Sequence, residues 1–237
     1  MRKQSALFCA MAVAALTPLA SAASGVFQVN SAVLSRTSGH SIASVSDANN
    51  LLSGAWPASV TNQTTAQVIN YYDPQSANVW LSHFPYTKVP FPTDTAGVDN
   101  FFALRATGTL VIPTTGAYTF GVNSDDGFDL KVGSTDLMSA GNRNASDSLK
   151  TITLAAGNYP IDLTYYQSLG QSEVELWAGP GTWSTFNAAP AGTFRLIGDT
   201  STPKALQLAA TAVPEPATAT VGLVSAALLL VRRRRAM

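Results

Sequence analysis

The sequence predicts an all-β fold, an antiparallel β-sandwich with one short N-terminal helix, within a chain of 237 residues. First, apolar and polar side chains alternate along several short segments, which is the pattern of half-buried strands. Second, Gly, Pro and Asn separate these segments, as they do in turns. Third, only one segment carries helix-boundary residues. Together these observations favour a sandwich or a barrel.

The first 22 residues have the order of a secretory signal peptide, with cleavage expected after Ala22. Arg2 and Lys3 precede an apolar run, and small residues follow it. The one cysteine, Cys9, leaves with this peptide. The processed chain therefore has no thiol, which excludes disulfides, cysteine-based zinc sites and cysteine catalysis.

The last segment, residues 213–237, combines Pro214, Glu215 and Pro216 with fifteen mostly apolar residues and then Arg232, Arg233, Arg234 and Arg235. A helix of that length spans about 22 Å, shorter than the apolar core of a membrane at about 30 Å, so it predicts transient insertion. The arginines are expected to stay cytoplasmic, which leaves the body outside the inner membrane. The order closely resembles the PEP-CTERM sorting signal of Gram-negative bacteria that make exopolysaccharide. This resemblance implies an exosortase that removes the tail; a plain stop-transfer anchor is the alternative.

Between these ends, residues 23–64 are expected to join the sandwich, residues 65–200 to form its body, and residues 201–212 to add a final strand or a linker. The stretch "SVSDANNLLSG" predicts the helix, with Ser44 or Ser46 as its N-cap and Gly54 at its end.

The strands are expected where alternation is clearest. One face of each is predicted to enter the core, and these faces carry Tyr118, Phe120 and Val122; Phe128, Leu130 and Val132; Ile152 and Leu154; and Ile161, Leu163 and Tyr165.

Two stretches are expected to be irregular. Residues 133–150 are polar and too long for a hairpin turn, so they predict either a functional or a loosely ordered loop. Residues 83–100 contain three prolines and are expected to wrap the sandwich as a surface connection.

Charge narrows the range of partners. Without its signal peptide and arginine tail, the chain keeps 8 basic residues against 14 acidic residues, a net charge of about −6. Nucleic acid is therefore not an expected partner, because its phosphates require a basic surface. Cations and neutral polymers fit better.

The stretch "NSDDGFDLK" places Asp125 and Asp126 side by side in a chain that is only 12% charged. Two interpretations are open, a solvated turn or a cation site. Catalysis is not indicated, because nothing in the sequence separates the pKa values of two adjacent carboxylates.

The runs "GTLVIPTTGAYTFGVNSDDGFDLKVG" and "LAAGNYPIDLTYYQSLGQSEVELW" together resemble the anthrax protective-antigen lectin-like domain family, a jelly-roll-like β-sandwich found in toxins, glycosidases and yeast flocculin adhesins. In the adhesins the adjacent aspartates, joined by a cis peptide, ligate a calcium ion that also contacts sugar hydroxyls. The resemblance implies the same roles for Asp125 and Asp126. Where the adhesins place an asparagine ligand, this chain has Gln167, which offers the same oxygen on a longer arm.

Aromatic side chains can serve as platforms for sugar rings, because they bury a large area at a small entropy cost. Tyr166 has the most favourable position, because alternation sends it opposite Tyr165 and close to Gln167. Trp177, Trp183 and Phe186 are expected to pack, and His40 and His83 lie outside any metal-ligand spacing.

The sequence thus predicts a non-enzymatic, exported protein of the cell surface or exopolysaccharide matrix that binds a glycan with calcium. A purely structural surface protein without a small ligand is the alternative.

Overall fold

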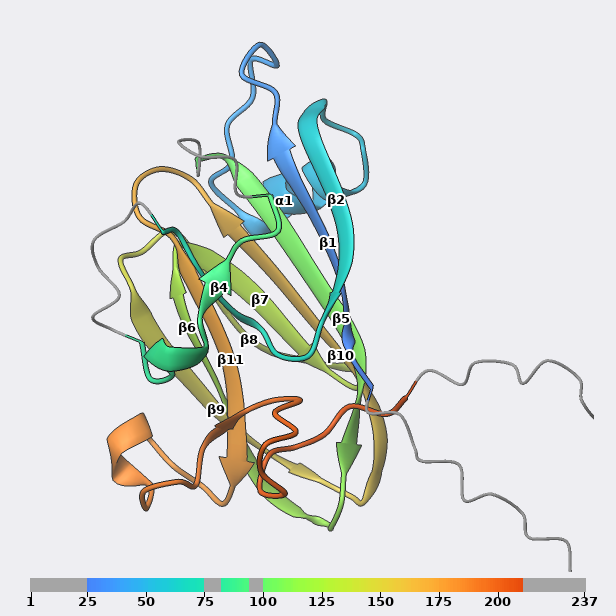
Figure 1. Cartoon of the computed structure of the whole chain (residues 1–237), viewed down its shortest axis with the longest axis vertical. Coiled ribbons are helices and arrows are strands. Elements are labelled where there is room, and N and C mark those ends of the chain that lie inside the picture. Colours follow the sequence, from blue (N-terminus) through green and yellow to red (C-terminus); the bar gives the residue numbers. More distant parts are fainter. Residues whose placement is uncertain (1–24, 75–81, 94–99, 211–237) are drawn as a thin grey trace, which may run out of the picture.

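The computed structural model describes residues 25–74, 82–93 and 100–210, and these form two β-sheets packed face to face (Figure 1). The signal peptide and the sorting-signal residues Pro214, Glu215, Pro216 and Arg232 to Arg235 lie outside the described residues. Among the residues that are described, no helix is long and apolar enough to cross a membrane.

The first sheet has the strand order β2-β1-β5-β10-β7-β8, and all of its pairings are antiparallel. Its strands are β1 (Phe27–Leu34), β2 (Ala58–Ala66), β5 (Phe102–Ile112), β7 (Gly127–Val132), β8 (Thr135–Ala140) and β10 (Gly157–Gln167).

The second sheet has the order β4-β3-β11-β6-β9, with β12 paired to β11. Its strands are β3 (Asn70–Tyr72), β4 (Val89–Pro90), β6 (Gly116–Asp125), β9 (Ser146–Leu154), β11 (Glu173–Pro180) and β12 (Arg195–Leu196). The β3–β4 pair is parallel. Two 3₁₀ turns, η1 (Pro85–Thr87) and η2 (Phe186–Ala188), lie in the connections.

The main core lies between the sheets and contains the alternating side chains of the central strands. The residues expected to point inward from β6, β7 and β10 are all in this cluster, as is Leu154 of β9, and Ile152 packs against it. The alternation therefore identified the core face of each of these strands correctly.

The predicted helix is present as α1 (Val45–Leu52). Ser44 is its N-cap and its side chain accepts a hydrogen bond from the Asp47 N–H, which satisfies a donor that the first helical turn leaves free. Ala48 and Leu51 are buried in a second apolar cluster that α1 forms against the outer side of the first sheet.

The structure corrects the expectation of an irregular loop over residues 133–150. The structure places β8 there and begins β9 at Ser146. Only Leu137 of β8 is buried, since this strand is at the edge of its sheet. An edge strand with one buried residue has little alternation to detect, which is why the sequence did not reveal it.

The segment from Ser82 to Thr93 first covers part of the outer side of the second sheet, then joins its edge through β4, and Phe91 enters the core. It carries η1 and β4, and its polar groups contact β11: the Glu175 carboxylate accepts hydrogen bonds from the His83 and Phe84 N–H groups at 2.9 and 3.2 Å. This part of the expected surface connection therefore does wrap the sandwich.

Candidate functional site

The two adjacent aspartates lie where the chain passes from one sheet to the other. Asp125 ends β6 in the second sheet, and Gly127 begins β7 in the first. The Asp125–Asp126 peptide bond is cis, as the resemblance implied. Glycine is required at position 127, because a Cβ atom there would lie 2.4 Å from the Tyr166 ring. The backbone of the aspartate loop, residues 124–127, thus approaches β10 closely.

Asp126 is buried, and its polar groups are bonded to two other loops. One carboxylate oxygen accepts a hydrogen bond from the Arg143 N–H at 3.2 Å, and the other accepts one from the Ser168 N–H at 2.8 Å. Its own N–H donates to Gln167 Oε1 at 3.0 Å. Asp126 therefore ties the aspartate loop to the β8–β9 loop and to the loop that follows β10.

The Asp125 carboxylate is less buried than that of Asp126, and neighbouring groups neutralise its negative charge only in part. Burial, and next the negative charge of Asp126, raise the pKa of the Asp125 carboxyl to about 6. Glu173 pairs with Asp125 across the β6–β11 ladder and adds further negative charge. A cation placed between the two aspartates would relieve this repulsion.

Arg143 is the one basic side chain bonded into the aspartate loop in the described part of the chain, and the sequence did not point to it. Its guanidinium donates to Ser124 Oγ at 2.9 Å, Ser148 Oγ at 2.8 Å and the Ser146 carbonyl at 2.8 Å. It also lies over the Phe128 ring, 5.2 Å from the centroid. Its charge partly offsets that of Asp125, yet the pKa of Asp125 stays raised. A lone arginine in a polar loop carries no periodic signal, so only the fold brings it here.

Gln167 lies beside the aspartates as expected, but its polar atoms already have partners. Oε1 accepts from the Asp126 N–H and, at 3.1 Å, from the Tyr165 hydroxyl, while Nε2 donates to the Gln171 carbonyl at 2.8 Å. The side chain is completely buried. To ligate a metal, Oε1 would have to exchange at least one of these bonds.

Tyr166 does point to the face opposite Tyr165, but that face is not open. Its ring packs in the cluster under α1, and its hydroxyl donates to the Ala43 carbonyl at 3.1 Å. The side chain is 0% exposed. This placement corrects the expectation of a sugar platform, because α1 covers a strand face that alternation alone would leave in solvent.

The other aromatic candidates pack, as expected. Trp177 is fully buried and contacts the rings of His83, Phe186 and Phe194. His83 also stacks on Phe186 at 3.6 Å and bonds to the Asp147 carboxylate at 2.8 Å. The Trp183 indole N–H donates to the Pro180 carbonyl at 2.8 Å.

The donor set of the aspartate loop fits a hard cation in part. Two carboxylates supply charge and up to four oxygens, whereas calcium takes six to eight. Backbone carbonyls and water would have to supply the rest. Within the described ranges, no group of three or more His, Cys, Asp or Glu side chains is arranged to hold a metal ion.

Comparison with known proteins identifies the class of the fold. Residues 88–183 match the family model of the PA14 domain. A search of curated proteins gives no match.

Solved structures show the same fold over most of the chain. The PA14 sugar-binding domain of an RTX adhesin aligns with a TM-score of 0.53 and 17% identity, covering 80% of this chain and 100% of that one. The PA14 domain of the antifreeze protein MpAFP aligns with a TM-score of 0.53 and 15% identity, covering 81% of this chain and 93% of that one. The epithelial adhesin 9 A domain of Candida glabrata was solved with Galβ1-4GlcNAc and with Galβ1-3GlcNAc. The complex with Galβ1-3GlcNAc aligns with a TM-score of 0.50 and 15% identity, covering 80% of this chain and 92% of that one.

Proposed function

We propose that this protein binds carbohydrate at the aspartate loop and that a calcium ion held by Asp125 and Asp126 mediates the contact. One observation carries the proposal: at the sheet-to-sheet junction of a PA14 domain, a half-buried carboxylate stands next to a second one, and its pKa is raised to about 6. Calcium suits such a pair because it prefers hard oxygens and tolerates irregular geometry. The sugar-binding RTX adhesin domain and the disaccharide-bound adhesin 9 domain support the ligand class.

The residues around the pair have supporting roles in this proposal. Gln167 and Ser168 hold Asp126 from the side of β10, and the Tyr166 ring packs directly against the backbone of Gly127. The half-buried Asp125 carboxylate would hold the ion together with the remaining lone pairs of the Asp126 carboxylate, whose two oxygens also accept the Arg143 and Ser168 N–H groups. Sugar hydroxyls would complete the coordination of the ion in place of water. Gln167 Oε1 could ligate the ion only if its hydrogen bond to the Asp126 N–H or to the Tyr165 hydroxyl were broken.

A glycan array probed with the processed protein tests this function directly. The expected result is binding in millimolar calcium that is lost on chelation and restored by calcium but not by magnesium, which requires stricter octahedral geometry. The variant D125N/D126N is expected to fold and to give no signal. Binding that survives both chelation and this double substitution would contradict the proposal.

A structural protein without a small ligand is the second candidate, and a specific observation favours it. Asp126 and Gln167 already have internal partners, and Arg143 supplies a positive charge from within the chain. In that case calcium would leave the aspartate loop unchanged, and no glycan on the array would bind. Glycan turnover by the same preparation would instead indicate an enzyme.

Export and sorting complete the proposal and rest on the sequence. The signal peptide and the tail from Pro214 to Arg235 would send the body across the inner membrane and present it to an exosortase, which leaves a cell-surface or matrix protein. Intact-mass analysis of the protein from an exosortase-positive host is expected to show a chain that ends near Pro216. A mass that still includes Arg232 to Arg235 would refute processing.

A further inference from the structure

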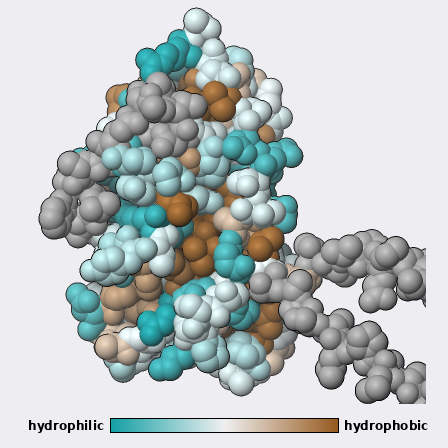
Figure 2. Space-filling view, in the orientation of Figure 1, coloured by the Kyte–Doolittle hydropathy of each residue, from teal (hydrophilic) through white to brown (hydrophobic). Residues whose placement is uncertain are grey.

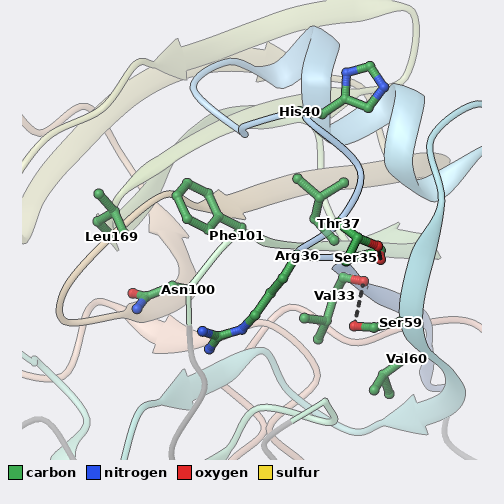
Figure 3. A pocket seen from close by; sticks show the side chains of 11 residues that line it. Val33, Ser35, Arg36, Thr37, His40, Ser59, Val60, Asn100, Phe101 and Leu169 are labelled. Carbon is green, nitrogen blue, oxygen red and sulfur yellow. Dashed lines mark hydrogen bonds between the residues drawn. The ribbon is translucent and has the colours of Figure 1, made fainter.

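A cavity of about 650 Å³ opens next to the 35–40 loop, at the same end of the molecule as α1 (Figures 1 and 3). Its walls come from the end of β1, the 35–40 loop, the start of β2, residues 100–101 and Leu169. The volume falls within the range of about 300–1,000 Å³ typical of small-molecule sites. Neither Asp125, Asp126 nor Gln167 lines it, so it is separate from the aspartate loop.

One wall of the cavity is apolar and contains Phe101, whose backbone has an unusual conformation. Phe101 has a φ of 56°, and it is the one non-glycine residue with positive φ in the described part of the chain. Two hydrogen bonds enforce this: the Phe101 N–H donates to the Ser168 carbonyl at 2.9 Å, and the Leu34 N–H donates to the Phe101 carbonyl at 2.8 Å. Such conformations persist only where the surroundings impose them, and they cluster at binding sites.

Leu169 lies beside Phe101 in Figure 3 and is 63% exposed. Val33 and Val60 add apolar surface on the other side. The cavity therefore offers a contact for the apolar face of a ring.

The remaining lining is polar and positively charged. Arg36 is exposed and extends along the cavity in Figure 3, and no ion pair to it exists among the described residues. Among the residues that the structure describes, no Asp or Glu lines the cavity, although the processed chain is acidic. Asn100 Oδ1 accepts the Gly170 N–H at 2.9 Å, which leaves its amide nitrogen as a donor, and Ser35 and Ser59 add hydroxyl groups.

Figure 2 shows hydrophilic residues interspersed with hydrophobic ones at this upper end. Ser35 Oγ bonds to Thr37 Oγ1 at 3.1 Å and Ser59 Oγ donates to the Val33 carbonyl at 3.3 Å, so each hydroxyl can still accept a hydrogen bond from a ligand. A neutral apolar ligand would make no use of these hydroxyls or of the Arg36 guanidinium. A bare inorganic anion would make no contact with the apolar side chains of Phe101 and Leu169, which would stay exposed to water. The lining thus selects a ligand that carries a carboxylate, several hydroxyl groups and one apolar ring face.

We propose that this cavity is a second carbohydrate subsite that takes an acidic sugar, with the carboxylate of a hexuronate on Arg36, its hydroxyls on Asn100, Ser35 and Ser59, and its apolar face on Phe101 and Leu169. The ligand class rests on the proposed carbohydrate-binding function. The subsite itself needs no calcium, because its charge contact comes from the protein.

Titration of the processed protein with glucuronate, and separately with glucose, by chemical-shift mapping tests the proposal. The expected result is that glucuronate shifts the signals of Phe101 and Leu169 in the presence of chelator, whereas glucose binds at least tenfold more weakly. Arg36→Gln is expected to weaken glucuronate at least tenfold. The matched control Lys204→Gln removes an exposed cation remote from the cavity lining and is expected to change nothing.

The variant D125N/D126N separates this inference from the proposed function. Retained glucuronate binding in that variant supports the subsite, even if calcium-dependent glycan binding is lost. Glucuronate binding that is abolished by chelation or by D125N/D126N, and is unaffected by R36Q, would place the sugar on the calcium site and overturn the subsite alone. Absence of any shift at Phe101 or Leu169 would also overturn it.

Discussion

Replacing Lys88 with methionine is expected to destabilise the fold strongly, because it leaves a buried charge alone. Lys88 Nζ pairs with Glu173 Oε2, and the two side chains are only 2% and 5% exposed. The other Glu173 oxygen is buried without a hydrogen bond. Burial raises the pKa of Glu173, and the Lys88 charge opposes that rise. The buried Glu173 carboxylate therefore depends on Lys88 to remain ionised.

The magnitude follows from what remains after the change. Removing one partner of a buried ion pair costs about 3–5 kcal/mol. For a domain of this size, that corresponds to a fall in Tm of about 6–20 °C. Urea denaturation is expected to give a lower midpoint with an unchanged slope. The double variant K88M/E173Q should recover much of the loss, since it removes the unpaired charge as well.

The control is Lys204→Met, which removes an exposed lysine and is expected to have an effect within about 0.5 kcal/mol. If K88M unfolded within about 1 kcal/mol of the unmodified protein, the Lys88–Glu173 pair would not hold the Ser82–Thr93 segment on the second sheet. The assignment of that segment as a fixed cover would then be wrong.

Three further outcomes are expected. Asp147→Asn should reduce the acid sensitivity of unfolding: burial raises the Asp147 pKa, but hydrogen bonds from His83 and Asn123 outweigh it, so the net pKa is lowered. The stabilisation from Asp147 is thus present above the unfolded-state pKa and is lost as pH falls through the folded-state value, and equal acid loss in both proteins would contradict this. Gly121→Ala should destabilise by more than about 1 kcal/mol in urea titrations, because its Cβ would lie 2.1 Å from the Trp177 ring, and an unchanged midpoint would refute that contact. Arg143→Gln should tighten calcium binding about tenfold in calorimetry, because it removes a positive charge beside Asp125; equal or weaker affinity would show that Arg143 does not compete with the ion.

The two-sheet core was accessible from the sequence, because period-two alternation reports directly which side of a strand is buried. Tyr118, Phe120 and Val122 on β6 show this most clearly, since all three enter the core. The helix was accessible as well, because Ser44 is an N-cap that acts through local bonds.

The features that were missed depend on contacts between distant segments. Glu173 and Glu175 alternate with core residues and look solvent-facing, yet the Ser82–Thr93 segment buries both. Tyr166 is covered by α1 in the same way, and Arg143 reaches the aspartates only through the β8–β9 connection. Alternation predicts which side of a strand a residue occupies, but not which distant segment covers that side.

Calcium binding to the processed protein, measured by calorimetry and by thermal unfolding with and without D125N/D126N, tests the central claim most directly. At a calcium concentration one hundred times its Kd, the folded state gains about 2.7 kcal/mol, or about 5–11 °C in Tm. The account predicts that gain for the unmodified protein, a much smaller one with magnesium, and none for D125N/D126N measured against that variant's own calcium-free Tm. No heat of binding and no change in Tm at millimolar calcium would contradict it and leave Asp125 and Asp126 as a turn neutralised from within by Arg143.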